Sequence, residues 1–222
     1  MPTKEELSNK ARYNIDDLTE IMRLLRAPDG CPWDREQTHA SIRRDLIEET
    51  YETAEAIDKN DPEMLCEELG DILLQVIFHS QLSAEEGSFT FADVVDGICK
   101  KMVLRHPHVF GDVTVGSTED VLTNWDAIKQ RSHGRKTVRE ALEGVSPALP
   151  ALMRAAKLAK KANKAGMEFE DGFTQIPDAA LEETVGKKLF ALAAAAELRG
   201  CDPETALERA CEGFISGFGE SK

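Results

Sequence analysis

Acidic side chains gather in two neighbouring stretches of the sequence. The first, Asp45–Ile57, reads DLIEETYETAEAI and holds five carboxylates within eleven residues. Each stretch contains two acids three residues apart, which a helix projects from one patch of its surface; the pairs are Glu49 with Glu52 and Glu68 with Asp71. Four converging carboxylates provide the oxygen ligands that hard divalent cations such as Mg²⁺ or Mn²⁺ prefer. The spacing therefore predicts a metal site if two helices bring the pairs together.

The elements that must position these pairs are helices. Helical periodicity dominates the sequence, and strand-like alternation is confined to the short stretch 109–115. The acidic stretches fall on predicted helices at 38–57 and 62–86, the second opened by Asp61 as N-cap and Pro62 at the first helical position. Because the break between them is short, we expect the two helices to lie antiparallel. Further helices are predicted over 18–25, 91–104, 118–130, 150–165, 178–199 and 204–218, with loops at 31–34 and 106–116 and a linker at 132–147. The expected fold class is all-α, in two helical units.

A solvated helix face is the competing interpretation of the first acidic stretch. On the helix at 38–57 apolar residues lie on one side and acids on the other, so this helix alone is better explained as an ordinary amphipathic helix. The helix at 62–86 is apolar nearly all round, so Asp71 is expected to be shielded from water. A buried carboxylate costs several kcal/mol or takes up a proton unless it has a partner such as a cation. Gly70 adds to this prediction, because close approach of another helix is a common reason to tolerate a mid-helix glycine.

A redox di-iron centre is an alternative to the predicted Mg²⁺ or Mn²⁺ site. Ferritin-like bundles use two Glu-x-x-His pairs, whereas this chain has one such pair, Glu36 and His39, at the start of a predicted helix. We therefore do not expect a di-iron site.

Two pairs of residues with i, i+4 spacing could bind the phosphates and the base of a nucleotide. Lys101 and Arg105 form one pair, and Trp125 and Lys129 form the other. Taken alone, the first is explained as a surface pair and the second as a core tryptophan beside a lysine that extends to solvent. Beside an acidic metal site, however, cations suit polyphosphate oxygens and an aromatic side chain suits a base. A nucleoside polyphosphate is therefore a candidate ligand.

Composition restricts the class of protein. The chain has 222 residues, of which 41% are hydrophobic and 31% charged, and it shows no apolar run of about 18 residues and no apolar signal-peptide core. We therefore expect no membrane span and a cytoplasmic location. The five cysteines include no CxxC pair, which argues against a disulfide framework or a zinc site. A net charge of −14 disfavours nucleic acid as a partner.

Several short segments together carry a family resemblance. Glu48-Glu49-x-x-Glu52, followed after fifteen residues by Glu68-x-x-Asp71, matches an EExxE and ExxD pattern. The flanking segments are GCPWDREQTHASI (30–42), EELGDILLQVIFHSQ (67–81), KMVLRHPHVFGD (101–112) and NWDAIKQ (124–130). Nearly the whole chain thereby resembles the MazG branch of the all-α nucleoside triphosphate pyrophosphohydrolases.

The resemblance implies roles for particular residues. In that family the second and third glutamates of EExxE and both acids of ExxD hold Mg²⁺, which here means Glu49, Glu52, Glu68 and Asp71. Glu48 would be a further ligand or would help to orient water, and Glu49 or Glu52 could accept the proton of that water. The nucleotide contacts would be Lys101, Arg105, Trp125 and Lys129. The implied reaction converts a nucleoside triphosphate and water into a monophosphate and pyrophosphate, in a homodimer, for nucleotide-pool cleaning or nucleotide-level regulation.

The resemblance also divides the chain into a catalytic domain at 1–140 and a truncated, degenerate second MazG-like domain at 141–222. LEETVGKKLFAL at 181–192 is similar to the family's LEEELGDLLFAL, with Thr184 and Lys187 where two metal ligands would stand. Gly213 and Gly217 stand in place of a second basic pair. We therefore expect this half to be catalytically silent, with a packing or dimer role. The alternative for the whole chain is a nucleotide-sensing or scaffold protein that hydrolyses slowly or not at all.

Overall fold

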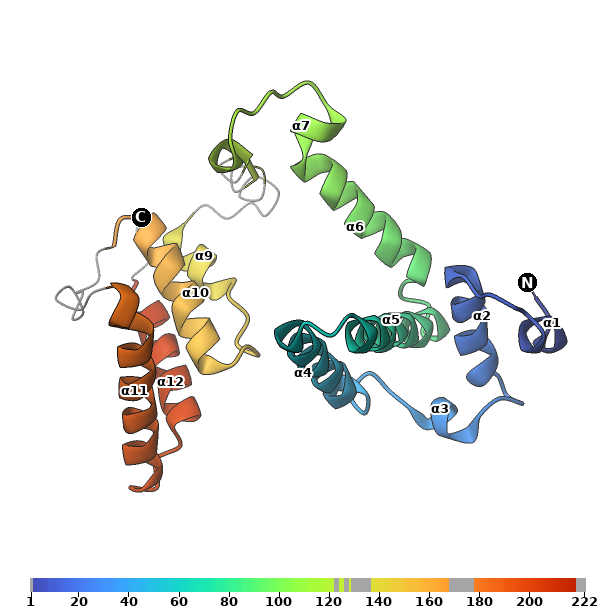
Figure 1. Cartoon of the computed structure of the whole chain (residues 1–222), viewed down its shortest axis with the longest axis horizontal. Coiled ribbons are helices and arrows are strands. Elements are labelled where there is room, and N and C mark those ends of the chain that lie inside the picture. Colours follow the sequence, from blue (N-terminus) through green and yellow to red (C-terminus); the bar gives the residue numbers. More distant parts are fainter. Residues whose placement is uncertain (1, 122–123, 126–127, 129–136, 168–177, 219–222) are drawn as a thin grey trace. The chain divides into compact units, whose positions relative to one another are not determined.

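The computed structural model is built from helices (Figure 1). It describes residues 2–121, 124–125, 128, 137–167 and 178–218, and over these ranges helices are the only regular secondary structure. The predicted all-α fold class is confirmed. The chain divides into two compact units, Met1–Val121 (unit 1) and Leu122–Lys222 (unit 2). Among the described residues, no helix has the length and apolar character needed to cross a membrane.

The helices follow the predicted order closely. Those described in unit 1 are α1 (Lys4–Ser8), α2 (Ile15–Leu25), α3 (Pro32–Glu36), α4 (Arg43–Lys59), α5 (Pro62–Glu85), α6 (Phe91–Arg105) and α7 (Pro107–Phe110). Those described in unit 2 are α9 (Val138–Glu143), α10 (Ala151–Lys164), α11 (Asp178–Glu197) and α12 (Pro203–Ser216). The helix predicted at 118–130 lies partly outside the described residues.

A tight turn joins α4 to α5 and sets the geometry of unit 1. Asn60 ends α4 in the left-handed conformation, with φ 52° and ψ 39°, which asparagine tolerates better than most residues. Asp61 then caps α5, and its carboxylate accepts hydrogen bonds from the backbone N–H groups of Glu63 and Met64, each at 3.0 Å. The two helices consequently form a hairpin and pack along each other. The predicted break and the predicted N-cap are both present.

Short helices replace two of the predicted loops. α3 and α7 begin at Pro32 and Pro107, because the fixed φ of proline suits the first helical position. The helix predicted from Thr38 starts only at Arg43. The hydroxyls of Ser41 and Thr38 accept hydrogen bonds from each other's backbone N–H groups, at 2.9 and 3.2 Å, and these local bonds compete with the helix. The predicted linker also contains a helix, α9.

The core of unit 1 lies where α2, α5 and the start of α4 meet. Its buried residues are Met22, Ile42, Ile77, Phe78 and Leu82. Arg26, at the end of α2, lies 5.5 Å from the centre of the Phe78 ring and pairs with Glu85 at 2.7 Å. The same guanidinium donates to the backbone carbonyls of Asp34 and Gln37. Arg26 therefore ties the α3 segment to α5.

α4 turns a different face toward α5 than its apolar pattern predicted. Its buried residues are Thr53 and Ala56, whereas Ile47 is 40% exposed and Tyr51 62% exposed. α5 leaves Leu69 52% exposed, so the prediction that this helix is covered on all sides is wrong for the described chain. Hydrophobic periodicity identifies an apolar side of a helix but not the partner that covers it. Both corrections leave exposed apolar residues on the hairpin.

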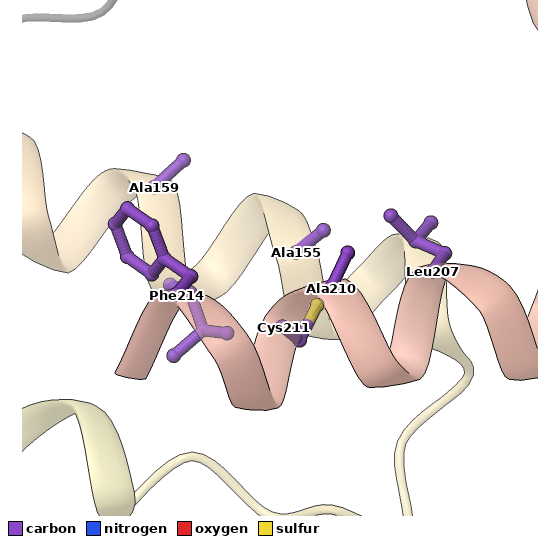
Figure 2. A pocket seen from close by; sticks show the side chains of 7 residues that line it. Ala155, Ala159, Leu207, Ala210, Cys211 and Phe214 are labelled. Atoms are coloured by element: carbon purple, nitrogen blue, oxygen red, sulfur yellow. The ribbon is translucent and has the colours of Figure 1, made fainter. Parts of the chain in front are cut away.

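Unit 2 is held by a core between α9, α10 and α12. Its buried residues are Leu142, Val145, Leu158, Ala162, Cys211 and Ile215. Arg154 is 3% exposed and pairs with Glu212 at 2.6 Å, which fixes α10 against α12. An apolar pocket of about 220 Å³ lies along these two helices (Figure 2). Its described lining consists of alanines, leucines, Phe214 and Cys211. Burial raises the pKa of the Cys211 thiol. The described lining therefore offers no side chain suited to acid–base catalysis.

Removing the α5 cap should weaken the hairpin. We expect Asp61→Ala to lower the free energy of unfolding by about 1 kcal/mol, because two backbone N–H groups of α5 lose their acceptor. Chemical denaturation followed by circular dichroism measures the change. Asp58→Ala, which removes an exposed acid near the same turn, is the control and should stay within about 0.5 kcal/mol of the wild type. Equal stability of the two variants would contradict the assigned cap.

Candidate active site

Three acidic side chains converge between α4 and α5. One carboxylate oxygen from each lies within 4.8 Å of the other two, and the residues are Glu49 of α4 and Glu68 and Asp71 of α5. All three side chains are half-buried. We call these three residues the carboxylate cluster. The hairpin thus brings together three of the four predicted metal ligands.

Glu52, the fourth predicted ligand, lies beside the carboxylate cluster. Its side chain is exposed and is not one of the three that converge. It lies one turn away from Glu49, and its charge acts on both Glu49 and Glu68. Glu52 is therefore within electrostatic reach of the cluster while remaining open to solvent.

The carboxylates of the cluster oppose one another's ionisation. Burial raises the pKa of Glu49, and the charges of Asp71, Glu52 and Glu68 raise it further. Burial is also the largest cause that raises the pKa of Glu68, followed by the charges of Glu52 and Asp71. Every charged neighbour that shifts these two pKa values is an acid. Oxygen ligands that repel one another in this way fit a hard divalent cation, which would favour their ionised forms.

Glu48 has a different partner. Its carboxylate pairs with Arg44 of the preceding turn at 2.8 Å, and both side chains are largely exposed. The structure therefore places Glu48 in an ion pair along α4 and not in the carboxylate cluster. Its predicted role beside the metal stays a prediction.

Two of the predicted nucleotide-binding residues lie apart from the carboxylate cluster within unit 1. Lys101 and Arg105 belong to the last five residues of α6, which contacts α5 and then leads away from the hairpin (Figure 1). Trp125 is half-buried and belongs to unit 2, and Lys129 lies outside the described residues. One copy of unit 1 therefore does not gather the predicted cations at the carboxylates.

Gly70 does not mark a close approach of helices within the chain. A Cβ atom added at this position would meet no atom within 4 Å, and the residue is exposed. The prediction of a close helix contact at this glycine is therefore wrong for the described chain. Gly70 follows the exposed Leu69, on a part of α5 that its own chain leaves uncovered.

Unit 2 carries other interactions where metal ligands would stand. The Thr184 hydroxyl donates to the Ala180 carbonyl at 2.8 Å, and Lys187 pairs with Glu183 on the exposed side of α11. In the described residues of unit 2, no three ligand side chains converge as they do in unit 1.

Three polar side chains outside the predicted site follow Asp71 along α5. Gln75 is 8% exposed, and His79 contacts His39 of the segment before α4. Ser83 is also buried. These residues recur at four-residue intervals in an otherwise apolar helix, so their common face could have been recognised from the spacing.

Comparison with known proteins bears on the segment that holds the carboxylate cluster. Residues 37–110 match the model of the MazG nucleotide pyrophosphohydrolase domain. The nucleoside triphosphate pyrophosphohydrolase/pyrophosphatase MazG of Thermotoga maritima is 38% identical over 218 residues, which cover 92% of this chain and 84% of that protein. The chain belongs to the MazG family.

A further relative and a solved structure match different shares of the chain. The nucleoside triphosphate pyrophosphohydrolase of Escherichia coli K12 is 39% identical over 226 residues, 93% of this chain and 86% of the relative. The crystal structure of a MazG-related protein from Thermotoga maritima matches at a TM-score of 0.45 and 26% identity, over 52% of this chain and 99% of that one. The family match at 37–110 contains α4, α5 and α6, and therefore the whole carboxylate cluster. The predicted class, a hydrolase of the MazG family, is confirmed.

Repulsion within the carboxylate cluster predicts how the stability of the metal-free MazG chain depends on pH. A carboxyl group whose pKa is raised by folding binds more protons in the folded state than in the unfolded state. The free energy of unfolding therefore falls as pH rises from the ordinary glutamate pKa through the raised values. Glu49→Gln removes one of the charges. In EDTA at pH 7 we expect this variant to melt on the order of a few degrees above the wild type, and the difference should vanish near pH 4.

Thermal unfolding at the two pH values measures this effect. Asp58→Asn, an exposed acid of the same helix, is the control and should melt like the wild type at both. Added Mn²⁺ should raise the melting temperature of the wild type and leave that of Glu49→Gln nearly unchanged. A Glu49→Gln protein that melts at or below the wild-type temperature at pH 7 in EDTA would show that the carboxylates do not repel one another.

Proposed function

We propose that this MazG protein hydrolyses a nucleoside triphosphate to the nucleoside monophosphate and pyrophosphate, using Mg²⁺ held by the carboxylate cluster. The observation that carries the proposal is the convergence of Glu49, Glu68 and Asp71 within the segment that matches the family. The relatives from Thermotoga maritima and Escherichia coli are named for this activity. Mn²⁺ accepts the same oxygen ligands and is the expected substitute.

The proposed reaction needs no covalent nucleophile from the chain. A divalent cation bound at the cluster supplies positive charge to the phosphate oxygens and lowers the pKa of a water molecule. Glu52 can complete the coordination, and it is the better placed of the two candidate bases because it is open to the solvent that finally receives the proton. Glu48 can help to orient the water once it leaves Arg44.

Basic residues would bind the substrate in this scheme. We propose that Lys101 and Arg105 form charge-assisted hydrogen bonds with the phosphates, with Trp125 against the base and Lys129 as a further cation. Because α6 leads away from the hairpin within unit 1, the contacts of Lys101 and Arg105 require a second copy of the protein packed on unit 1. The dimer is therefore part of the proposed site.

A homodimer also fits the exposed apolar residues of unit 1. Each of the following is at least 37% exposed: Ile47, Tyr51 and Ile57 on α4, Leu69 and Leu73 on α5, and Val95, Ile98, Val103 and Leu104 on α6. Large exposed apolar surfaces commonly mark sites of association. The proposed protein partner is a second copy of this chain, and the net charge of −14 argues against nucleic acid.

The remaining organisation follows from the same family resemblance. We propose that residues 1–140 form the catalytic domain and that 141–222 form a silent second MazG-like domain. The partners that Thr184 and Lys187 find within α11 support this assignment. A cytoplasmic location is proposed because all five cysteines are free thiols, as is usual in a reducing compartment.

Turnover of nucleoside triphosphates tests the proposed function. We expect pyrophosphate release from common or damaged nucleoside triphosphates with Mg²⁺ or Mn²⁺, and none in EDTA. Asp71→Asn should lower kcat at least about 100-fold with an unchanged circular dichroism spectrum. Mutating a residue that supports a metal ligand typically costs about 10–100-fold in activity, and loss of the ligand itself should cost more. Glu67→Gln, an exposed acid of the same helix, is the matched control and should stay active. Nucleotide binding without turnover would favour the nucleotide-sensing alternative, and full activity of Asp71→Asn would remove Asp71 from the site.

Light scattering during size-exclusion chromatography tests the dimer. We expect twice the mass of the 24.5 kDa chain. Leu69→Lys places a charge at an exposed apolar position of α5 and should produce the monomer, because an unpaired charge buried in an interface costs several kcal/mol. Val113→Lys, at a loop position that is 43% exposed, should leave the dimer intact. A monomeric wild type at micromolar concentration would contradict the proposal.

A further inference from the structure

Four polar residues share one stripe of α5. Asp71, Gln75, His79 and Ser83 follow one another at four-residue intervals, a spacing that places each side chain beside the next along a stripe that winds slowly around the helix. Gln75 is 8% exposed and Ser83 2% exposed, in a helix that buries mainly apolar side chains in the core of unit 1. The stripe therefore leads from the carboxylate cluster into the core of unit 1. Each buried polar atom on it requires a hydrogen-bond partner.

Two histidines from distant parts of the sequence meet on this stripe. The Nδ1 atom of His39, in the segment before α4, lies 2.7 Å from the Nδ1 atom of His79. The planes of the two rings differ by 4°, and the ring centres are 5.0 Å apart. The Ser83 hydroxyl lies 3.3 Å from the Nε2 atom of His39. A hydrogen bond between two Nδ1 atoms needs one proton only, so one imidazole donates and the other accepts.

Two buried atoms on the stripe have no hydrogen-bond partner. They are the Oε1 atom of Gln75 and the Nε2 atom of His79, whose residues lie one helical turn apart. The amide oxygen is an acceptor, and the imidazole nitrogen is a donor or an acceptor according to its tautomer. A buried polar group without a hydrogen-bond partner destabilises the folded state. One bridging water can satisfy both atoms, because it donates to the amide oxygen and either donates to the histidine nitrogen or accepts from it.

The direction of the hydrogen bonds around the histidines decides between the tautomers. If the Ser83 hydroxyl donates to His39, the proton of His39 is on Nδ1 and His79 accepts at its own Nδ1. The proton of His79 is then on Nε2, and it is the donor that the Gln75 oxygen lacks. In the opposite direction, His79 Nε2 is an acceptor, and a bridging water has to donate to this nitrogen and to the Gln75 oxygen. Only in the first direction do all hydrogen bonds from Ser83 to Gln75 run the same way, and the mutual strengthening of such bonds favours it.

The protonation of His79 is consistent with that choice. Burial lowers its pKa, and the neighbouring His39 lowers it further. The imidazole is therefore neutral at physiological pH. A neutral ring can accept at Nδ1 while it donates from Nε2, as the selected direction requires.

We propose that the polar stripe and His39 form one directed chain of hydrogen bonds that positions the Asp71 carboxylate. The order of the chain is Ser83, His39, His79, a buried water, Gln75 and Asp71. The water accepts from His79 and donates to the Gln75 oxygen, which leaves the Gln75 amide N–H groups for Asp71 one turn away. Gln75 and His79 are thus positioning residues that act through Asp71. The metal-related part of this inference rests on the proposed function, which makes Asp71 a ligand.

Nitrogen-15 NMR of the histidines in the metal-free full chain tests the tautomers. Long-range proton–nitrogen correlation distinguishes Nδ1–H from Nε2–H, and the spectra of His39→Gln and His79→Gln assign the two residues. We expect His39 as the Nδ1–H form and His79 as the Nε2–H form. Detection of His79 as the Nδ1–H form would overturn the hydrogen-bond chain.

Metal affinity tests the positioning of Asp71. Gln75→Met and His79→Phe should each weaken Mn²⁺ binding to the nucleotide-free chain by about 10–100-fold, as measured by electron paramagnetic resonance. The double variant should bind no more weakly than the weaker single variant, because both residues act through one chain. Ser80→Ala removes a different buried hydroxyl of α5, one that donates to the Val76 carbonyl at 2.7 Å, and should keep the wild-type affinity. Wild-type affinity in folded Gln75→Met and His79→Phe would overturn the proposal.

These measurements separate the inference from the proposed function. A wild-type chain that binds no Mn²⁺ would overturn the proposed metal site, while the NMR experiment still tests the hydrogen-bond chain. If the two core variants do not fold, His39→Gln replaces them, because His39 is exposed and its loss leaves the core filled. We expect His39→Gln to weaken Mn²⁺ binding in the same direction. Unchanged affinity in that variant would count against the chain.

Discussion

Repulsion between carboxylates across the α4–α5 hairpin is the constraint on which unit 1 depends. Oxygens from three acids within 4.8 Å of one another would push the helices apart if this contact alone joined them. The hairpin is instead fixed by its turn at Asn60 and Asp61, and by the core that α5 shares with α2. Packing away from the carboxylates therefore holds them together, and a cation bound between them would convert mutual repulsion into attraction.

The same constraint accounts for the exposed apolar residues of the hairpin. A helix that is acidic on one side and apolar on the other can turn only one of these sides toward a single partner. α4 turns Glu49, Thr53 and Ala56 toward α5 and leaves Ile47 and Tyr51 exposed. In the proposed dimer a second copy covers those residues, and it also brings basic residues that α6 carries away from its own hairpin. The proposed metal site and the proposed dimer interface then both follow from the face that α4 turns toward α5.

Much of the hairpin could be predicted from the sequence, because its signals are local. Asp61 followed by Pro62 marks the start of α5, and the three-residue spacing of Glu68 and Asp71 puts both acids on one patch. The face of α4 that meets α5 could not be predicted, because periodicity does not identify the covering partner. The contact of His39 with His79 could not be predicted either, since it joins residues 40 positions apart through a turn that delays the start of α4.

In the proposed second MazG-like domain, α11 is the helix that would correspond to α5, and its described residues form no cluster of converging carboxylates. Where the family resemblance expects two acids, α11 has Thr184, bonded to the Ala180 carbonyl, and Lys187, paired with Glu183. Both interactions lie within one helix and need neither a second helix nor a cation. Converging carboxylates with raised pKa values lower stability at neutral pH until a cation binds. A unit without a bound cation is therefore more stable without converging carboxylates, so their convergence in unit 1 favours a cation bound there.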